Sequence, residues 1–152
     1  GDATVLHIGC GTSALSIQLS EAHPALHFLH ADFSTLSLEQ MRLRHPTLSW
    51  VGMDARALPF GDGRLASVVE KGTMDAMLRS GEDDWLVMAR EVLRVLQPGG
   101  TFLQVTDEAP ELRLPLLEFL APHWQVSFSV VDSEGVEEGL CYESFLYTCR
   151  KM

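Results

Sequence analysis

The segment Thr4-Val5-Leu6-His7-Ile8-Gly9-Cys10-Gly11-Thr12-Ser13-Ala14 joins a short apolar run to two closely spaced glycines. The apolar run predicts a strand that is buried on both faces. Ser13 predicts the cap of a helix that carries Leu15, Leu19 and Ala22 at helical spacing. Because glycine permits a tight turn between the two elements, the segment predicts the first strand-turn-helix unit of a parallel α/β sheet.

Four further apolar runs of similar length follow, and helical patterns separate most of them. The runs are Leu26–Ala31, Leu48–Met53, Leu65–Val69 and Thr101–Val105. Alternation of short buried strands with helices is typical of parallel strands joined by right-handed crossovers. We therefore expect a Rossmann-like, doubly wound α/β sheet that is mostly parallel.

Two of the helices have recognisable ends. Ser37 and Gln40 have the spacing of a capping box. Asp83 precedes the clearest helical pattern in the chain, and Pro98-Gly99-Gly100 is expected to end it. The apolar face of that helix is expected to consist of Trp85, Ala89, Val92 and Leu96.

The C-terminal third of the chain follows a different pattern. A helix is expected from Pro110 to about Leu120. Two strands then follow at Trp124–Val131 and Tyr142–Cys149, joined by the acidic loop Asp132–Gly139. Because no helix fits between these strands, we expect them to form an antiparallel hairpin.

Composition limits the class of protein. With 152 residues, of which 46% are hydrophobic, we expect one domain over residues 1–152. The formal net charge of −10 argues against a nucleic-acid partner, and no apolar run is long enough to span a membrane. Pro24 separates His23 from His27, so we expect no metal site. The oligomeric state stays open.

Polar residues at the strand ends predict a nucleoside site. Gly9 and Gly11 let a ligand approach the backbone, next to the free amides of a helix N-terminus. Asp32 ends the second strand, where a carboxylate can accept hydrogen bonds from both ribose hydroxyls. The same pattern serves NAD and S-adenosylmethionine. Asp54, which can accept from an adenine amino group, favours the latter, and so does the C-terminal hairpin.

The fourth strand ends in an unusual charged segment, Glu70-Lys71-Gly72-Thr73-Met74-Asp75-Ala76. This segment resembles the D/E-K-G-T-x-D-A signature of a subgroup of protein lysine methyltransferases, and the whole chain resembles the core of their superfamily, the class I (seven-strand) S-adenosylmethionine-dependent methyltransferases. The subgroup includes enzymes that methylate elongation factor 1-alpha or mitochondrial citrate synthase. Residues 106–115 are similar to an S-D-E-x-P-x-x-R-L-P run of the citrate synthase enzyme.

The resemblance implies roles for individual residues. Glu70 is the candidate catalytic residue, accepting a hydrogen bond from the incoming amine or from the methionine end of the cofactor; pairing with an arginine is the alternative. Asp107 and Glu108 are candidates for substrate contact. Thr73 and Asp75 are expected in the first turn of a short helix. S-adenosyl-L-methionine is expected to contact Gly9, Cys10, Gly11, Asp32, Phe33, Asp54, Ala55 and Lys71.

The chain also departs from the family pattern. His7 stands where many members have an acid, and Ser13 replaces a third glycine. We expect the family's N-terminal cover segment to be absent, which would weaken cofactor binding. The resemblance implies a folded protein substrate, citrate synthase or elongation factor 1-alpha, and a mitochondrial matrix location with the cytoplasm as alternative. A small-molecule methyltransferase and a non-catalytic cofactor-binding module are the other functional alternatives.

Overall fold

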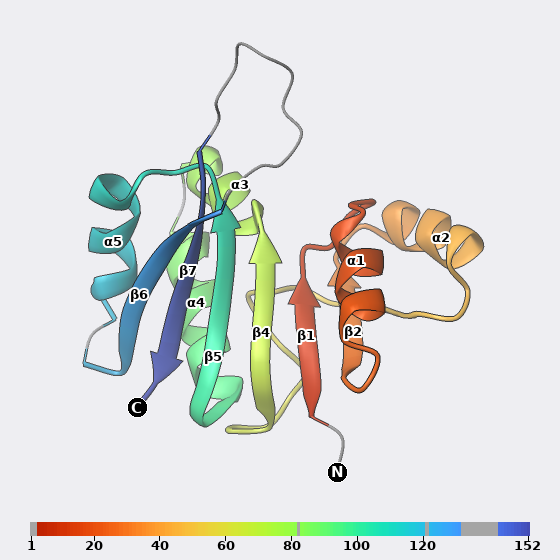
Figure 1. Cartoon of the computed structure of the whole chain (residues 1–152), viewed down its shortest axis with the longest axis horizontal. Coiled ribbons are helices and arrows are strands. Elements are labelled where there is room, and N and C mark those ends of the chain that lie inside the picture. The colour runs from red at the N-terminus through yellow and green to blue at the C-terminus, as the bar shows by residue number, and fades with distance from the viewer. Residues whose placement is uncertain (1–2, 82, 121, 132–142) are drawn as a thin grey trace.

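The computed structural model describes residues 3–81, 83–120, 122–131 and 143–152. These residues form one seven-stranded sheet in the order β3-β2-β1-β4-β5-β7-β6 (Figure 1). The pairs from β3 to β5 are parallel, whereas β7 is antiparallel to both β5 and β6. The strands are β1 Thr4–Ile8, β2 His27–Asp32, β3 Ser49–Gly52, β4 Leu65–Lys71, β5 Leu96–Thr106, β6 Trp124–Val131 and β7 Ser144–Lys151.

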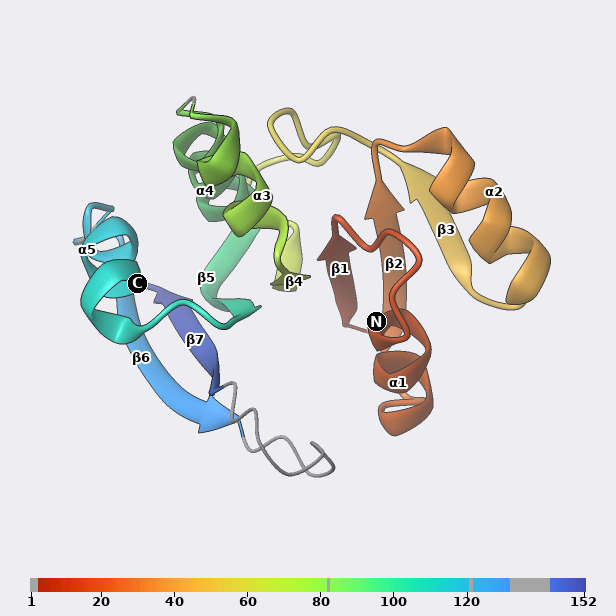
Figure 2. The same cartoon turned by 90° about the horizontal axis from the view of Figure 1, so that it is seen from above.

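Helices flank this sheet, and α3, α4 and α5 lie on the side opposite α1 (Figure 2). The predicted Rossmann-like, mostly parallel α/β fold is therefore confirmed, with an antiparallel β6–β7 pair at one end. The predicted loop Asp132–Gly139 lies outside the described residues. The helices are α1 Leu15–Ala22, α2 Thr35–Arg44, α3 Thr73–Ser80, α4 Asp84–Val95 and α5 Pro110–Glu118.

The main core lies between the sheet and helices α3 to α5. Val68 of β4 and Phe102 of β5 pack there against Met88 and Val92 of α4, and all four side chains are fully buried. Trp85 is partly buried against the same core, as its place on the apolar face predicted. Each fully buried apolar side chain of this size contributes about 1.5–3 kcal/mol of transfer free energy, so this layer fixes α4 on the sheet.

The start of α2 differs from the prediction. Ser34 is the N-cap, and its Oγ accepts a hydrogen bond from Ser37 N at 3.3 Å. The predicted capping box of Ser37 and Gln40 is therefore wrong, because β2 ends at Asp32 and the extended Ser34 already satisfies the first free amides. Among the described helices, none is long and apolar enough to cross a membrane.

Pro98-Gly99-Gly100 lies inside β5, so its predicted role as the helix stop is wrong, and so is the place of Leu96 on the helix face. The helix α4 ends at Val95, and β5 already begins at Leu96. The β4–β5 register then shifts, because Leu65 faces Leu96 whereas Ser67 faces Thr101. A Cβ at position 100 would lie 2.9 Å from Gln97 O and 3.0 Å from Ala66 O, so the irregularity requires glycine.

Candidate functional site

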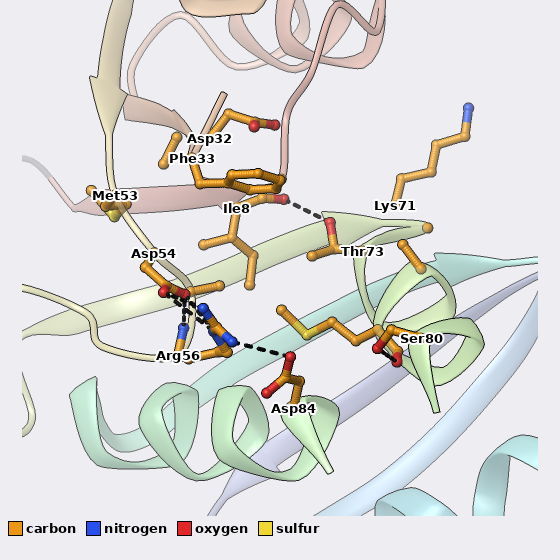
Figure 3. Close-up of a pocket in the computed structure, with 16 residues that line it drawn as sticks. Ile8, Asp32, Phe33, Met53, Asp54, Arg56, Lys71, Thr73, Ser80 and Asp84 are labelled. Carbon is orange, nitrogen blue, oxygen red and sulfur yellow. Dashed lines mark hydrogen bonds and ion pairs between the residues drawn. The ribbon is translucent and has the colours of Figure 1, made fainter. Parts of the chain in front are cut away.

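A cavity of about 530 Å³ opens at the carboxyl ends of β1, β2 and β4 (Figure 3). Strand order reverses here, because β1 pairs with β2 on one side and with β4 on the other. Ligands of open α/β sheets bind at such switch points. The lining comes from the β1 turn, the ends of β2 and β4, the segment after β3, one side of α3 along its whole length, and the first turn of α4.

The glycine turn after β1 forms one edge of this cavity. Gly9 and Gly11 have φ angles of +62° and +50°, a region that favours glycine. A Cβ at Gly9 would also overlap the Thr73 side chain, whose Oγ1 donates to Ile8 O at 3.3 Å. Cys10 is buried and does not line the cavity, and burial raises the pKa of its thiol to about 12. The turn therefore presents backbone to the cavity and packs directly on α3.

Asp32 joins two elements at the cavity wall. Its Oδ2 accepts from Gly11 N and its Oδ1 accepts from Ser34 N, each at 2.8 Å. The side chain is nearly buried yet lines the cavity. A carboxylate has about four lone-pair positions, so the two oxygens can still accept from a ligand's hydroxyl groups. The geometry suits the ribose contact predicted for this residue.

A second acid, Asp54, is held by an arginine that the sequence reasoning missed. Arg56 binds Asp54 at 2.9 Å and Asp84, in the first turn of α4, at 3.1 Å (Figure 3). These hydrogen bonds lower the pKa of the Asp54 carboxyl. All three residues line the cavity, so the pairs join the segment after β3 to α4. The two-residue spacing of Asp54 and Arg56 could have indicated their pair in the sequence. The pair of Arg56 with Asp84 could not be seen there, because 28 residues separate them.

Apolar and flexible side chains complete the lining. Phe33 is 85% exposed at the cavity rim, and Ala55 and Met53 line the wall between Asp32 and Arg56. Lys71, at the end of β4, is exposed and also lines the cavity. An exposed aromatic ring beside an apolar wall offers a surface on which a flat ligand ring can stack.

Glu70 lies behind this wall. Its side chain is fully buried, whereas the next three residues, Lys71 to Thr73, line the cavity. Glu70 Oε2 accepts from Thr73 N at 2.7 Å, and within the described residues Oε1 has no hydrogen-bond partner. Burial raises the pKa of the Glu70 carboxyl to about 7, against the lowering effect of the Thr73 amide. Two arrangements were expected for Glu70, contact with a ligand or an ion pair with an arginine. In the part of the chain that the structure describes, its carboxylate neither lines the cavity nor forms an ion pair.

The arginine expected near Glu70 pairs with Asp75 instead. Asp75 lies in the first turn of α3 as predicted, and its Oδ1 accepts from Arg113 of α5. Thr106 Oγ1 donates to Asp75 Oδ2 at 2.8 Å. Arg113 lies within residues 106–115, the run that resembles the citrate synthase enzyme, and its side chain is fully buried. Its partner is 38 residues away in sequence, so no local spacing reveals the pair.

The two predicted substrate residues lie on the chain that follows β5. Asp107 is exposed, and Glu108 donates its N–H to Thr106 Oγ1 at 3.0 Å and accepts from Tyr147 OH at 2.7 Å through its carbonyl. Neither lines the cavity. The structure therefore gathers six of the predicted site residues around the cavity, namely Gly9, Asp32, Phe33, Asp54, Ala55 and Lys71. It leaves five outside its wall, namely Cys10, Gly11, Glu70, Asp107 and Glu108.

Comparisons with known sequences agree with this geometry. A family described as methyltransferase domain matches residues 5–100. EEF1A lysine methyltransferase 4 from Bos taurus is 39% identical, over 72% of this chain and 48% of that protein. The mitochondrial citrate synthase-lysine N-methyltransferase CSKMT from Homo sapiens is 34% identical, over 93% of this chain and 65% of that protein. This chain therefore spans about half the length of the first relative and under two thirds of the second.

Solved structures share the fold at lower identity. A SAM-dependent methyltransferase from Methanosarcina mazei has a TM-score of 0.71 at 17% identity, covering 99% of this chain and 93% of that chain. TrmN from Thermus thermophilus has a TM-score of 0.73 at 20% identity, covering 99% of this chain and 44% of that chain. At these identities the likeness establishes the fold.

Proposed function

The chain belongs to the methyltransferase domain family, and from this membership we propose that it acts as an S-adenosylmethionine-dependent protein lysine N-methyltransferase. The observation that carries the proposal is the cavity at the β1 switch point, where a glycine turn and the Asp32 carboxylate meet. The similarity to two kinds of lysine methyltransferase supports a lysine amine as acceptor.

The residues around the cavity suit the parts of the proposed cofactor. Asp32 would accept from the ribose hydroxyls, and the backbone of Gly9 would approach the ligand closely. Asp54, Phe33 and Ala55 are proposed for the adenine end. Arg56 would share this end, because both Asp54 oxygens already accept from it. Lys71 to Thr73 would border the methionine end of the cofactor.

The proposed reaction needs alignment more than covalent help from the protein. When bound, S-adenosylmethionine would supply a methyl group activated by its sulfonium, with the neutral thioether as the leaving group. The lysine amine would first release its proton to solvent, and its lone pair would then form the new C–N bond. For a lysine with a pKa near 10.4, presenting the neutral amine at physiological pH costs about 4 kcal/mol. Desolvation of the amine as it enters the cavity would lower that cost.

Glu70 is proposed to act through the turn that follows it. Its Oε2 holds the Thr73 amide, and Thr73 packs on Gly9 across the cavity edge. This position supports a role in shaping the wall formed by Lys71 to Thr73. Asp107 and Glu108 remain proposed contacts for the protein substrate, since they follow β5 at the same edge of the sheet.

Citrate synthase is the proposed substrate, with the mitochondrial matrix as the compartment. The relative that acts on citrate synthase is similar over 93% of this chain. Elongation factor 1-alpha is the second candidate, with the cytoplasm as compartment, because the relative described for that substrate has the higher identity of 39%.

Methyl transfer with labelled cofactor tests the proposal. The purified chain is incubated with citrate synthase, with elongation factor 1-alpha, and with a cell extract that still contains its small molecules. Labelling of one protein on lysine supports the proposal and identifies the substrate. A labelled small molecule would replace it with small-molecule methylation. Cofactor binding without any labelled acceptor would instead indicate a non-catalytic binding module.

A further inference from the structure

Two buried side-chain atoms in the described part of the chain have no hydrogen-bond partner, Glu70 Oε1 and Arg113 Nε. One is an acceptor and the other a donor, and both side chains are fully buried. Buried polar atoms without partners are rare because each forfeits its hydration, so a complementary pair of them in one region is informative.

The two side chains flank the start of α3. The terminal nitrogens of Arg113 reach Asp75 in α3 and Gln104 Oε1 in β5, the latter at 3.2 Å. Gln104 Nε2 in turn contacts Met74 Sδ at 2.9 Å. Arg113 is therefore connected to two consecutive residues of α3 from the side away from the cavity.

The same part of α3 forms the cavity wall. Thr73, Ala76 and Met77 line the cavity, and they alternate along the helix with Met74 and Asp75, which face the buried cluster. A shift of the Arg113 guanidinium would therefore displace the first turns of α3, and with them the cavity wall. Positions near a reacting group are sensitive to displacements of this kind.

The described residues around the start of α3 include two carboxylates, those of Glu70 and Asp75, and the guanidinium of Arg113 is the positive charge that pairs with Asp75. The Arg113 charge also opposes the increase that burial and the Asp75 charge cause in the pKa of Glu70. Burial raises the pKa of the Tyr147 phenol of β7, and the charges of Arg113, Glu108, Glu111 and Asp75 also act on it, so these groups lie in the same region. Loss of the guanidinium would leave the Asp75 carboxylate without its arginine partner.

We propose that Arg113 is a positioning residue: it holds the α3 wall of the cavity through Asp75 and supplies the positive charge that balances Glu70 behind the Lys71–Thr73 turn. This inference rests on the proposed function, because the wall matters only if the cavity binds the cofactor. It gives Arg113 a role in ligand binding although the residue contacts no ligand.

Substitution of the arginine tests the role. Arg113→Met keeps an apolar stem but removes the charge, and we expect it to weaken S-adenosylmethionine binding in calorimetry by about tenfold or more. Arg113→Lys keeps the positive charge but loses the planar guanidinium, so its cofactor affinity should lie between those of the wild type and Arg113→Met. The conservative variant thus separates charge from shape. Arg79→Met, an exposed arginine on the same helix α3, is the matched control and should bind as the wild type does.

A double variant separates charge balance from a general packing defect. In Arg113→Met/Asp75→Asn the carboxylate that lost its arginine partner is also removed, so cofactor affinity should recover toward that of Asp75→Asn alone. Titration of the Glu70 carboxyl by NMR needs no ligand, and its midpoint should move to higher pH in Arg113→Met. Circular dichroism verifies that each variant is folded.

The outcomes distinguish this inference from the proposed function. Wild-type affinity and an unchanged Glu70 midpoint in Arg113→Met would overturn the positioning role. Strictly additive losses in the double variant would reduce Arg113 to a packing role and also overturn it. If the wild-type chain bound no cofactor while the Glu70 midpoint still moved, the charge balance would stand and the proposed function would fail.

Discussion

At the scale of single residues, carboxylates at strand ends do different work according to their burial. Asp32 lines the cavity and still has acceptor capacity, whereas Glu70 is fully buried behind it. Both end a parallel strand, so sequence position alone made them look equivalent. The difference arises from the direction of each side chain and from what packs over it.

Asp32→Ala should lose cofactor affinity. The change removes the acceptor for Gly11 N and Ser34 N as well as the proposed ribose contact. Charge-assisted hydrogen bonds of this kind are worth about 1.5–3 kcal/mol each, so we expect a loss of about a hundredfold or more in calorimetry. Glu39→Ala, an exposed acid on α2, is the control. Unchanged affinity of Asp32→Ala would contradict the assignment of the cavity.

Glu70→Gln should change how stability depends on pH. The Glu70 pKa is about 7 in the fold against an ordinary 4.5, so its protonated form stabilises the fold below pH 4.5 and this contribution is lost as pH rises through 7. The loss is on the order of 3 kcal/mol. Urea unfolding at several pH values should show the variant gaining stability relative to the wild type between about pH 4.5 and 7, the window set by the two Glu70 pKa values. A parallel pH dependence of the two proteins would argue against a buried, titrating Glu70.

At the scale of elements, a buried imidazole pair joins β1 and β2 beneath α1. His7 Nδ1 lies 3.1 Å from His30 Nδ1, and Ser16 and Ser20 of α1 contact the two rings at 3.2 and 3.0 Å. Burial lowers the pKa of His7 to about 3, with the His30 charge as a second cause, and burial lowers that of His30 to about 4. The cluster therefore stabilises the fold only while both rings are neutral.

Acidification should unfold the protein through this pair. Both histidines bind protons more readily in the unfolded chain, so stability is fully present above about pH 6.5 and falls as pH decreases toward the folded values. His30→Gln keeps polar partners without a titrating ring, and its stability should depend less on pH between about 4 and 6.5. Thermal unfolding across that range measures the effect. His27→Gln, an exposed ring on β2, should retain the wild-type slope.

At the scale of the whole molecule, the negative charge bears on encounter with a protein substrate. The formal net charge is −10, and a folded partner with basic patches would be attracted to this surface. Salt screens such attraction over about 8 Å at physiological ionic strength.

Added salt should therefore raise the KM for a basic protein substrate. We expect the KM to increase between about 0.05 and 0.3 M salt while kcat changes little, because screening acts on encounter. Steady-state methylation at fixed, saturating cofactor measures both constants. The dissociation constant of the cofactor, measured at the same salt concentrations, is the control. A KM that does not respond to salt would exclude charge-driven docking.

The elements and the glycine turn could be predicted because their signals are local in the chain. Apolar runs marked the strands to within two residues except for β5, which begins five residues earlier than predicted, and Gly9 and Gly11 lie in the turn between β1 and α1 as predicted. Asp32 and Asp54 were found for the same reason, since parallel strands bring their carboxyl ends to one edge. Within the described residues, even the antiparallel β6–β7 pair followed from the missing helix between its strands.

Which side chains meet, and which of them lose water, depends on long-range packing that no local pattern reveals. This packing inserted β7 between β5 and β6, joined Arg113 to Asp75 across 38 residues, and sealed Glu70 behind the turn that it begins. Propensities and capping act over a few neighbouring residues, whereas desolvation and ion pairing depend on every element packed around a group. Local sequence patterns were therefore enough to predict the fold and the place of the cavity, whereas packing sets the chemistry of the charged groups around it.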